Sequence, residues 1–251
     1  MLNAHGKWSL VTGASRGIGR QMALALGQAG VNVVVHSREL AGTHGLVEEL
    51  RDLGVEAFAV AGELSDPAQV RALADDVLRR VSVDLLFTNA GVQPPSHDPY
   101  WEADADEYVR TYLVNVVAPM ILVEKFLPGM LERGFGRITH TTSGILHQPE
   151  QSAYAASKGA LNKATLDLAA RLTDVDVTVN VADPGWIRTD LGGPDAPNAV
   201  ETVVPGMIVG GFVDADLDGA WINAQDFAGM TLEDAVAAAP AKALRLAVTT
   251  A

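Results

Sequence analysis

The sequence contains no cysteine among its 251 residues. Disulfide bonds, thiolate metal ligands and a cysteine nucleophile are therefore excluded by residue type. Basic residues are also few: 18 lysines and arginines stand against 31 acidic residues, which gives a net charge of −13. A nucleic-acid binder needs a cationic face that releases counterions from the phosphates. We therefore expect no nucleic-acid partner, and the same charge disfavours an anionic membrane surface.

No segment of the sequence is recognisable as one that would direct the chain into or through a membrane. Residues 1–6 lead directly into a strand-like segment, and no apolar run approaches membrane-spanning length. We expect a cytoplasmic protein with no membrane partner. The length is ordinary for a single α/β sheet domain. We expect one domain over 1–251, with a core over about 1–183 and a substrate cap and C-terminal segment over about 184–251.

Short apolar runs rich in β-branched residues alternate with longer amphipathic stretches, as in repeated βαβ units. The predicted strands cover 7–12, 31–36, 55–60, 83–88, 136–141 and 176–182. The predicted helices cover 17–29, 43–53, 67–80, 106–132, 153–172 and 231–239, the last of which we expect to stop at Pro240. A loop-rich stretch is expected over 192–219. The pattern predicts an α/β Rossmann fold, a doubly wound parallel sheet with helices on both faces.

A glycine-rich segment, 10–19, follows the first predicted strand and opens the first predicted helix. Its three glycines permit a tight turn and a close backbone approach to a pyrophosphate, and the helix N-terminus offers free N–H groups to the anion. A purely structural turn is the alternative. The residues that we expect to contact a dinucleotide here are Gly13, Ser15, Arg16, Gly17, Ile18 and Gly19.

The end of the second predicted strand indicates which dinucleotide is bound. An NAD enzyme usually places an acid there to hold the ribose 2′-hydroxyl, but Ser37 and Arg38 come before the first acid, Glu39. The guanidinium groups of Arg38 and Arg16 could bind a 2′-phosphate through forked, charge-assisted hydrogen bonds. Residues 1–40 carry four basic residues against one acid. We therefore predict NADP(H); the alternative is that both arginines are ordinary solvated charges.

Tyr154 and Lys158 lie four residues apart near the start of a predicted helix and therefore project from one face. A phenol has a pKa near 10 in solution, and a nearby ammonium group is expected to lower it. Ser143 ends the preceding strand, so its hydroxyl could lie beside the phenol and donate to a substrate oxygen. A strand-end cap is the alternative for Ser143.

Over about residues 7–190 the sequence resembles the short-chain dehydrogenase/reductase family, whose motifs occur here in the family's order. They are Thr12–Gly19, Asn89-Ala90-Gly91, Asn115, Ser143, Tyr154 with Lys158, and Pro184-Gly185 through Thr189. The resemblance implies that Tyr154 transfers the proton, that Ser143 holds the reacting oxygen, and that Lys158 lowers the phenol pKa and binds the nicotinamide ribose. It implies that Asn115 fixes a water in a proton relay; a structural amide is the alternative.

The resemblance also implies further cofactor contacts. The expected ones are Glu63, Leu64, Asn89, Ala90, Gly91, Tyr154, Lys158, Pro184, Gly185, Ile187 and Thr189. Glu63 departs from the family's usual aspartate beside the adenine. The family's usual closing Val-Asp-Gly-Gly segment is missing, and 219–227 occupies that region. Many members pair through their long helices, so we expect a homodimer or homotetramer through 106–132 and 153–172.

These observations predict an enzyme that transfers hydride between NADP(H) and a carbonyl or secondary-alcohol substrate, most simply a ketone or aldehyde reductase. A 3-ketoacyl (acyl-carrier) reductase and a non-catalytic NADP(H)-binding sensor are the alternatives. An acyl-carrier partner calls for a basic patch, whereas 191–251 holds eight acids against two basic residues. The loops 93–97, 145–151 and 191–210, with Trp186, are expected to select the substrate. No histidine cluster indicates a metal site.

Overall fold

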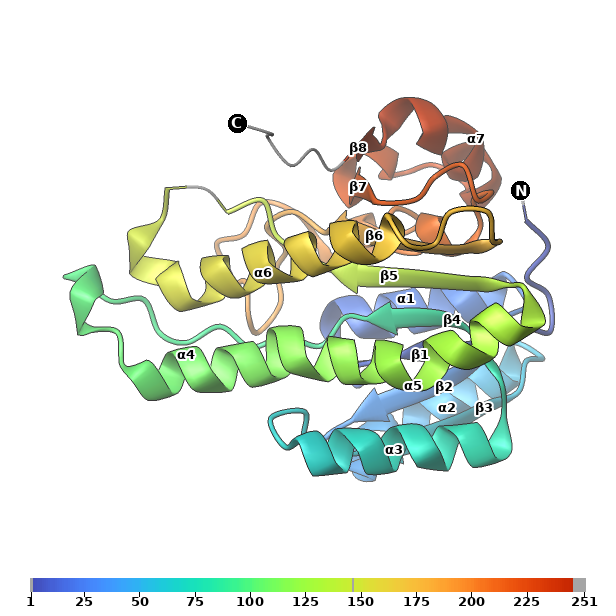
Figure 1. Cartoon of the computed structure of the whole chain (residues 1–251), viewed down its shortest axis with the longest axis horizontal. Coiled ribbons are helices and arrows are strands. Elements are labelled where there is room, and N and C mark those ends of the chain that lie inside the picture. The colour runs from blue at the N-terminus through green and yellow to red at the C-terminus, as the bar shows by residue number, and fades with distance from the viewer. Residues whose placement is uncertain (1, 146, 246–251) are drawn as a thin grey trace.

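The computed structural model describes residues 2–145 and 147–245. These residues form an eight-stranded sheet in the order β3-β2-β1-β4-β5-β6-β7-β8 (Figure 1). Strands β1 to β7 run parallel, and β8 pairs antiparallel with β7 at the edge. The strands are β1 (Trp8–Val11), β2 (Asn32–Ser37), β3 (Ala57–Ala61), β4 (Val83–Thr88), β5 (Gly136–Thr141), β6 (Val177–Asp183), β7 (Ala220–Asn223) and β8 (Leu244–Arg245).

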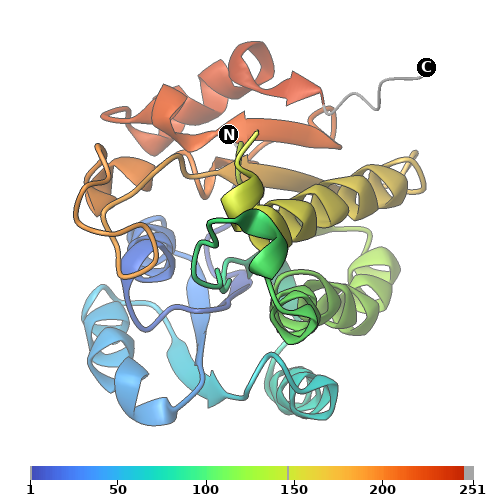
Figure 2. The ribbon, with the colours of Figure 1, turned by 90° about the vertical axis from the view of Figure 1, so that its left-hand side faces the viewer.

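Helices cover both faces of this sheet, which confirms the predicted fold class (Figure 2). They are α1 (Gly17–Gln28), α2 (His44–Asp52), α3 (Pro67–Arg80), α4 (Ala105–Tyr112), α5 (Ala118–Arg133), α6 (Ser152–Ala169) and α7 (Leu232–Lys242). One apolar core lies between the sheet and α1, α2 and α7, and a second lies beneath α3 and α5. Because both faces are covered, every residue of β2 and β5 is buried, as expected for central parallel strands.

Most predicted elements lie within two or three residues of their observed bounds. Asp66 caps α3: its side chain accepts hydrogen bonds from the backbone N–H groups of Ala68 and Gln69. Pro240 does not stop α7, which continues to Lys242. Proline removes only one N–H group from the helix, and the Ala243 N–H still donates to the Ala239 carbonyl at 2.8 Å.

Strands β7 and β8 were not predicted from the sequence. Strand β7 has only four residues, with buried Ala220 and Ile222 alternating with less buried neighbours, and it pairs with the end of β6. This region therefore supplies a seventh parallel strand although it lacks the family's usual closing motif. Residues 246–251 of the expected cap and Leu146 of the expected substrate loop lie outside the described residues.

The long predicted helix is continuous from Ala105 to Arg133 but contains a π-helical turn, Leu113–Val117, between α4 and α5. By length and composition this helix could cross a membrane, contrary to the expectation that no apolar run approaches that length. Half of its most apolar window is buried inside the fold, so packing against the sheet and α3 accounts for its composition.

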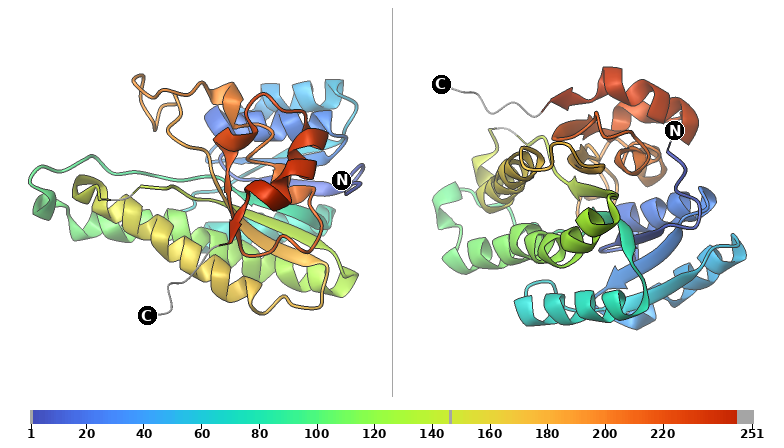
Figure 3. Two further views of the ribbon diagram at one scale, coloured as in Figure 1. Left: turned by 90° about the horizontal axis from the view of Figure 1, so that it is seen from above. Right: turned by 45° about the vertical axis from the view of Figure 1, so that its right-hand side comes forward.

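The segment 186–213 lies over the sheet on the side of α1, where Figures 2 and 3 show it in orange. Short 3₁₀ turns within it, Val200–Val203 and Val209–Gly211, bury their apolar side chains in the core beside α1. The expected loop over 192–219 is thus irregular, as predicted, but much of it belongs to the core.

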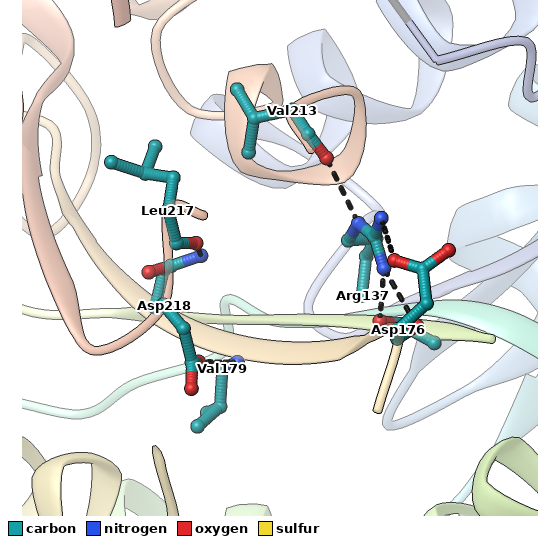
Figure 4. Close-up of polar contacts among 8 residues, drawn as sticks. Arg137, Asp176, Val179, Val213, Leu217 and Asp218 are labelled. Atoms are coloured by element: carbon teal, nitrogen blue, oxygen red, sulfur yellow. Dashed lines mark hydrogen bonds and ion pairs between the residues drawn. The ribbon is translucent and has the colours of Figure 1, made fainter. Parts of the chain in front are cut away.

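A buried arginine at the start of β5 fastens this segment to the sheet (Figure 4). Arg137 is 1% exposed; its Nε donates to the Val213 carbonyl at 3.0 Å, and its Nη1 donates to the Asp176 carbonyl at 2.9 Å. The Asp176 carboxylate accepts a further hydrogen bond. Nearby, the Val179 N–H donates to the Asp218 carboxylate at 2.7 Å. These bonds satisfy backbone groups that would otherwise be buried without partners.

Replacing Arg137 with alanine should therefore destabilise the protein, because three backbone carbonyl groups, those of Gly136, Asp176 and Val213, lose this donor and the side chain leaves a cavity. We expect a loss of about 3 kcal/mol in the free energy of unfolding, measured by urea denaturation. Arg79→Ala is the matched control, because this arginine is 68% exposed in its ion pair with Asp76, and it should cost less than about 0.5 kcal/mol. Equal losses in the two variants would contradict this account.

Candidate active site

A cleft of about 1310 Å³ runs along the carboxyl ends of the parallel strands, where ligands bind in open α/β sheets. Every cofactor residue predicted from the sequence lines it, as do Ser143, Tyr154 and Lys158. Asn115 is the one predicted site residue that does not line the cleft; it lies directly behind the wall. The fold thus brings together motifs that are spread over some 170 residues of the chain.

The glycine segment forms a cradle at the N-terminus of α1. Gly13 and Gly17 have positive φ angles, of 66° and 57°. A Cβ atom on Gly19 would lie 2.3 Å from the Gly13 carbonyl oxygen, so only glycine fits there. Arg16 precedes the helix without a side-chain cap, which leaves N–H groups of the first turn available to an anion. This cradle fits the pyrophosphate of a dinucleotide.

His36, at the end of β2, supports the cradle and was missed in the sequence. Its Nδ1 accepts a hydrogen bond from the Gly13 N–H at 3.3 Å, and its Nε2 lies 3.0 Å from the Gly62 carbonyl. This pairing requires the neutral ring with the proton on Nε2. Burial lowers the pKa of His36, and the Gly62 carbonyl and the Glu63 charge only partly oppose the shift. The feature of the sequence that could have indicated this role is a histidine directly before Ser37-Arg38.

Three arginines line the end of the cleft beside β2 and β3. Arg38 and Arg110 both act on Glu63: burial opposes its ionisation, but hydrogen bonds from Ser65 and the two guanidinium charges lower its pKa overall. Arg16 forms an ion pair with Asp190 across the cleft at 2.8 Å. The side chain of Ser37 is turned away, because its hydroxyl donates to the Glu39 carbonyl. Arg110 was not predicted from the sequence.

The segment of Asn89, Ala90 and Gly91 lies between the glycine cradle and α6. The Asn89 side chain donates to the Thr12 carbonyl at 3.0 Å, and the Ala90 N–H is bound by the Thr12 hydroxyl at 3.1 Å. A Cβ on Gly91 would lie 3.6 Å from the Lys158 ammonium nitrogen. The segment therefore supports the central sheet and passes close to Lys158.

Asn115 lies in the π-helical turn. Its Oδ1 accepts the Val92 N–H at 2.9 Å, and its Nδ2 donates to the Val92 carbonyl at 2.9 Å and to the Ser157 hydroxyl at 3.0 Å. The amide thus fixes the loop after β4 against α6. π turns are often found at functional sites, because they re-aim one residue of a helix.

Tyr154 and Lys158 project from one face of α6 into the cleft, as their spacing predicts, and both are buried. The Lys158 ammonium donates to the Thr141 carbonyl at 2.7 Å and lies 5.7 Å from the centre of the Tyr154 ring. Burial lowers the pKa of Lys158 to about 8, against the opposing charge of Asp183. Ser143, two residues after the end of β5, lines the cleft with Tyr154, and its hydroxyl lowers the pKa of the phenol.

The protein's own groups do not lower the pKa of Tyr154 as expected from its lysine neighbour. Burial raises this pKa to about 12, the Ser143 hydrogen bond lowers it, and the Asp183 charge raises it further. The physical reason is that desolvating the phenolate outweighs the attraction of an ammonium group that is directed at Thr141. The phenol therefore holds its proton firmly.

The segment after β6 forms the remaining wall of the cleft with Pro184, Gly185, Ile187 and Thr189. Asp183, directly before it, also lines the cleft and was not predicted. Trp186 is exposed, and its indole N–H donates to the Gly192 carbonyl at 2.7 Å. Among the residues that the structure describes, no group of three or more His, Asp or Glu side chains is placed to hold a metal ion.

Comparison with known proteins identifies the family. The model of the short chain dehydrogenase family matches residues 7–199. A short chain dehydrogenase of Pseudocercospora fijiensis is 33% identical over 196 residues, which cover 76% of this chain but only 62% of that longer protein. The 3-oxoacyl-[acyl-carrier-protein] reductase FabG of Staphylococcus aureus is 35% identical over 192 residues, 74% of this chain and 76% of the relative.

A solved structure agrees with these sequences. The blue fluorescent protein from a metagenomic library, crystallised with NADPH, is 29% identical, with a TM-score of 0.77 over 88% of this chain and 97% of that one. The family match covers well over half of the chain and includes the glycine cradle and the Tyr154–Lys158 helix. The chain belongs to the short-chain dehydrogenase family of oxidoreductases.

Proposed function

We propose that the protein is an NADP(H)-dependent oxidoreductase that interconverts a carbonyl compound and a secondary or primary alcohol, acting mainly as a ketone or aldehyde reductase. One observation carries this proposal. The buried Tyr154 phenol, its Ser143 hydrogen-bond partner and the buried Lys158 line the same cleft as the glycine cradle. A proton donor and a dinucleotide cradle in one cleft are what carbonyl reduction requires.

The cradle supports the cofactor assignment. Gly13, Gly17 and Gly19 leave room for the pyrophosphate, and Arg16 and Arg38 would hold the 2′-phosphate. Asn89 to Gly91 would lie along the middle of the cofactor, and Pro184, Gly185, Ile187 and Thr189 along its nicotinamide end. The NADPH complex of the related metagenomic protein agrees with this choice. When bound, the nicotinamide supplies or accepts the hydride.

The protein's own residues would manage the oxygen and its proton. The Tyr154 hydroxyl donates its proton to the carbonyl oxygen as that oxygen gains negative charge, and the Ser143 hydroxyl holds the same oxygen. Lys158 would bind the nicotinamide ribose and stabilise the phenolate that remains. Asn115 hydrogen-bonds Val92 and Ser157 and so keeps the wall behind Lys158 in place. The path by which the proton of Tyr154 would be replaced runs beside this wall.

The raised pKa of Tyr154 favours reduction over oxidation. A phenol with a pKa of about 12 is protonated throughout the physiological range, so the donor form needed for reduction is fully populated. Alcohol oxidation needs the phenolate. At pH values below that pKa, the population of the phenolate rises about tenfold with each unit by which the pH increases. Reduction should therefore change little with pH near neutrality, whereas oxidation should increase as the pH rises.

Reduction of a 3-oxoacyl thioester is the second candidate, because FabG of Staphylococcus aureus is among the similar proteins. The excess of acids over 191–251 makes an acidic carrier a poorer fit than a small carbonyl compound.

The substrate end of the cleft is lined by Gln93, Gln148, Gln151 and Trp186. His147 is exposed beside it.

We also propose the homodimer or homotetramer and the cytoplasmic location expected from the sequence. Val109 and Leu131 expose apolar side chains along the helix that contains α4 and α5, which agrees with a homodimer or homotetramer built on the long helices. The cytoplasm is the proposed location.

Replacing Tyr154 with phenylalanine should abolish turnover, with a loss of at least about a thousandfold in kcat, because the proton donor is removed. NADPH should still bind. The measurement is NADPH absorbance against a panel of ketones, aldehydes, β-keto esters and a 3-oxoacyl thioester. Tyr100→Phe is the control, since Tyr100 is 51% exposed outside the cleft. Full activity in the Tyr154 variant refutes the mechanism; NADPH binding without turnover of any compound by the native protein favours a sensor.

Replacing Arg38 with leucine should weaken NADPH binding about 10- to 100-fold and leave NADH binding nearly unchanged, because only the 2′-phosphate loses its charged partner. Protein fluorescence titrated with each cofactor measures this. Arg171→Leu, at an exposed position in the turn after α6, should change neither affinity. A native protein that prefers NADH would overturn the assignment.

Replacing Gly19 with alanine should raise the Kd for NADPH more than about tenfold, because the new Cβ meets the Gly13 carbonyl at 2.3 Å and Asn89 Nδ2 at 2.6 Å. Gly45→Ala is the matched control: nothing lies within 4 Å of its Cβ position in α2, so it should leave the Kd unchanged and stabilise slightly. Circular dichroism separates a lost cradle from a lost fold. Unchanged affinity in the Gly19 variant would remove the cradle from the binding site.

A further inference from the structure

Asp183 is the last residue of β6 and stands directly before Pro184-Gly185. It lines the cleft beside Ser143 and Tyr154, yet no catalytic or cofactor role follows for it from the motifs in the sequence. An acid at this point requires a physical explanation, because a carboxylate that is largely removed from water is costly unless it is paired.

Both oxygens of this carboxylate face backbone groups of neighbouring turns. Oδ1 accepts the Gly185 N–H at 2.9 Å. On its other side the carboxylate lies close to Gly144: a Cβ on Gly144 would lie 2.8 Å from Oδ2, and the Gly144 N–H lowers the pKa of the carboxylate. Gly144 must therefore remain glycine for the carboxylate to approach. The hydrogen bond that the carboxylate accepts from the Gly185 N–H favours its ionised form.

These two turns carry groups on which the reaction depends. Gly144 follows Ser143, and Gly185 opens the segment that reaches Ile187. The backbone ladder between β5 and β6 ends where the Thr142 N–H donates to the Ala182 carbonyl at 2.9 Å. The Asp183 side chain continues this connection past the end of the ladder and holds the two turns together.

The carboxylate also acts on the charged groups of the catalytic helix. Its negative charge raises the pKa of Tyr154 and opposes the fall in the pKa of Lys158 that burial causes. Burial raises the pKa of Asp183 itself, and the hydrogen bonds from Gly185 and Gly144 and the Lys158 charge lower it. The other titratable group beside Lys158 is His140 of β5, which burial keeps neutral with a pKa of about 3.

We propose that Asp183 is a positioning residue: its carboxylate, beside the Tyr154 phenol, clamps the Ser143-Gly144 turn to the Pro184-Gly185 turn. This inference rests on the proposed function for its effect on turnover. The clamp itself is a property of the protein and can be tested through cofactor affinity alone.

The experiment compares Asp183→Asn, Asp183→Ala and, as a matched control, Asp216→Asn, which changes an exposed acid away from the cleft. For each variant three quantities are measured: the Kd for NADPH by fluorescence, the kcat and KM for the best compound of the panel, and the pH profile of alcohol oxidation. The melting temperature reports whether each variant is folded.

The asparagine keeps an acceptor for Gly185 but lacks the charge. Its Kd should stay within about threefold of the native value, while the acid limb of the oxidation profile moves to lower pH by about 0.5 to 1 unit, because the phenolate is no longer disfavoured by a neighbouring anion. The alanine loses the clamp as well. Its Kd should rise about tenfold and its kcat should fall about 100-fold, because small displacements of reacting groups are costly.

A purely structural role would lower the melting temperature and leave the pH profile in place, and that result overturns the proposal. So does an Asp183→Ala variant whose Kd and kcat match those of Asp216→Asn. If Asp183→Ala does not fold, the asparagine variant still tests the charge through its pH profile. If the native protein turns over nothing, the proposed function fails while the NADPH Kd still decides the clamp.

Discussion

Lys158 is a cation held out of water, and the arrangement of the site depends on how the fold compensates for this. Moving an ammonium group from water into a protein interior costs several kcal/mol unless it is paired. The fold supplies the Thr141 carbonyl, at 2.7 Å, from the point where β5 ends and its carbonyl groups are free. It supplies the Asp183 carboxylate from the end of the next strand. A cation at the carboxyl edge of a parallel sheet can be satisfied in this way because strand ends converge there.

This buried charge restricts what its neighbours can be. His140 lies inside the same wall, where its Nδ1 is 2.6 Å from the Thr88 hydroxyl; burial and the Lys158 charge both lower its pKa, so it stays neutral and adds no second cation. Asn115 and Ser157 bind each other instead of the ammonium group. The π-helical turn places Asn115 in that position without ending the helix. The wall behind Tyr154 and Lys158 is thus polar and uncharged except at Lys158.

The sequence predicts the parts of the fold that local patterns determine. Glycine spacing located the cradle, and a four-residue spacing placed Tyr154 and Lys158 on one helix face. What it could not supply depends on contacts between distant segments. His36 and Asp183 act through the backbone of Gly13 and Gly144, which no local pattern links to them. The direction of the Tyr154 pKa likewise depends on burial, which outweighs the charge of its sequence neighbour. Strand β7 is too short to give a periodic signal.

One of the arginines at the cofactor end of the cleft is already paired with an acid before any anion arrives. Arg16 is paired with Asp190, with both side chains mostly exposed, at 68% and 75%, and exposed pairs of this kind contribute only about 0–1 kcal/mol. A phosphate that takes Arg16 from Asp190 therefore gives up little. Asp190 belongs to the 186–192 segment and Arg16 to the glycine cradle, so this exchange would release one wall of the cleft from the other. The fold thus keeps Arg16 in place at the edge of the cleft and leaves its guanidinium group available to an anion.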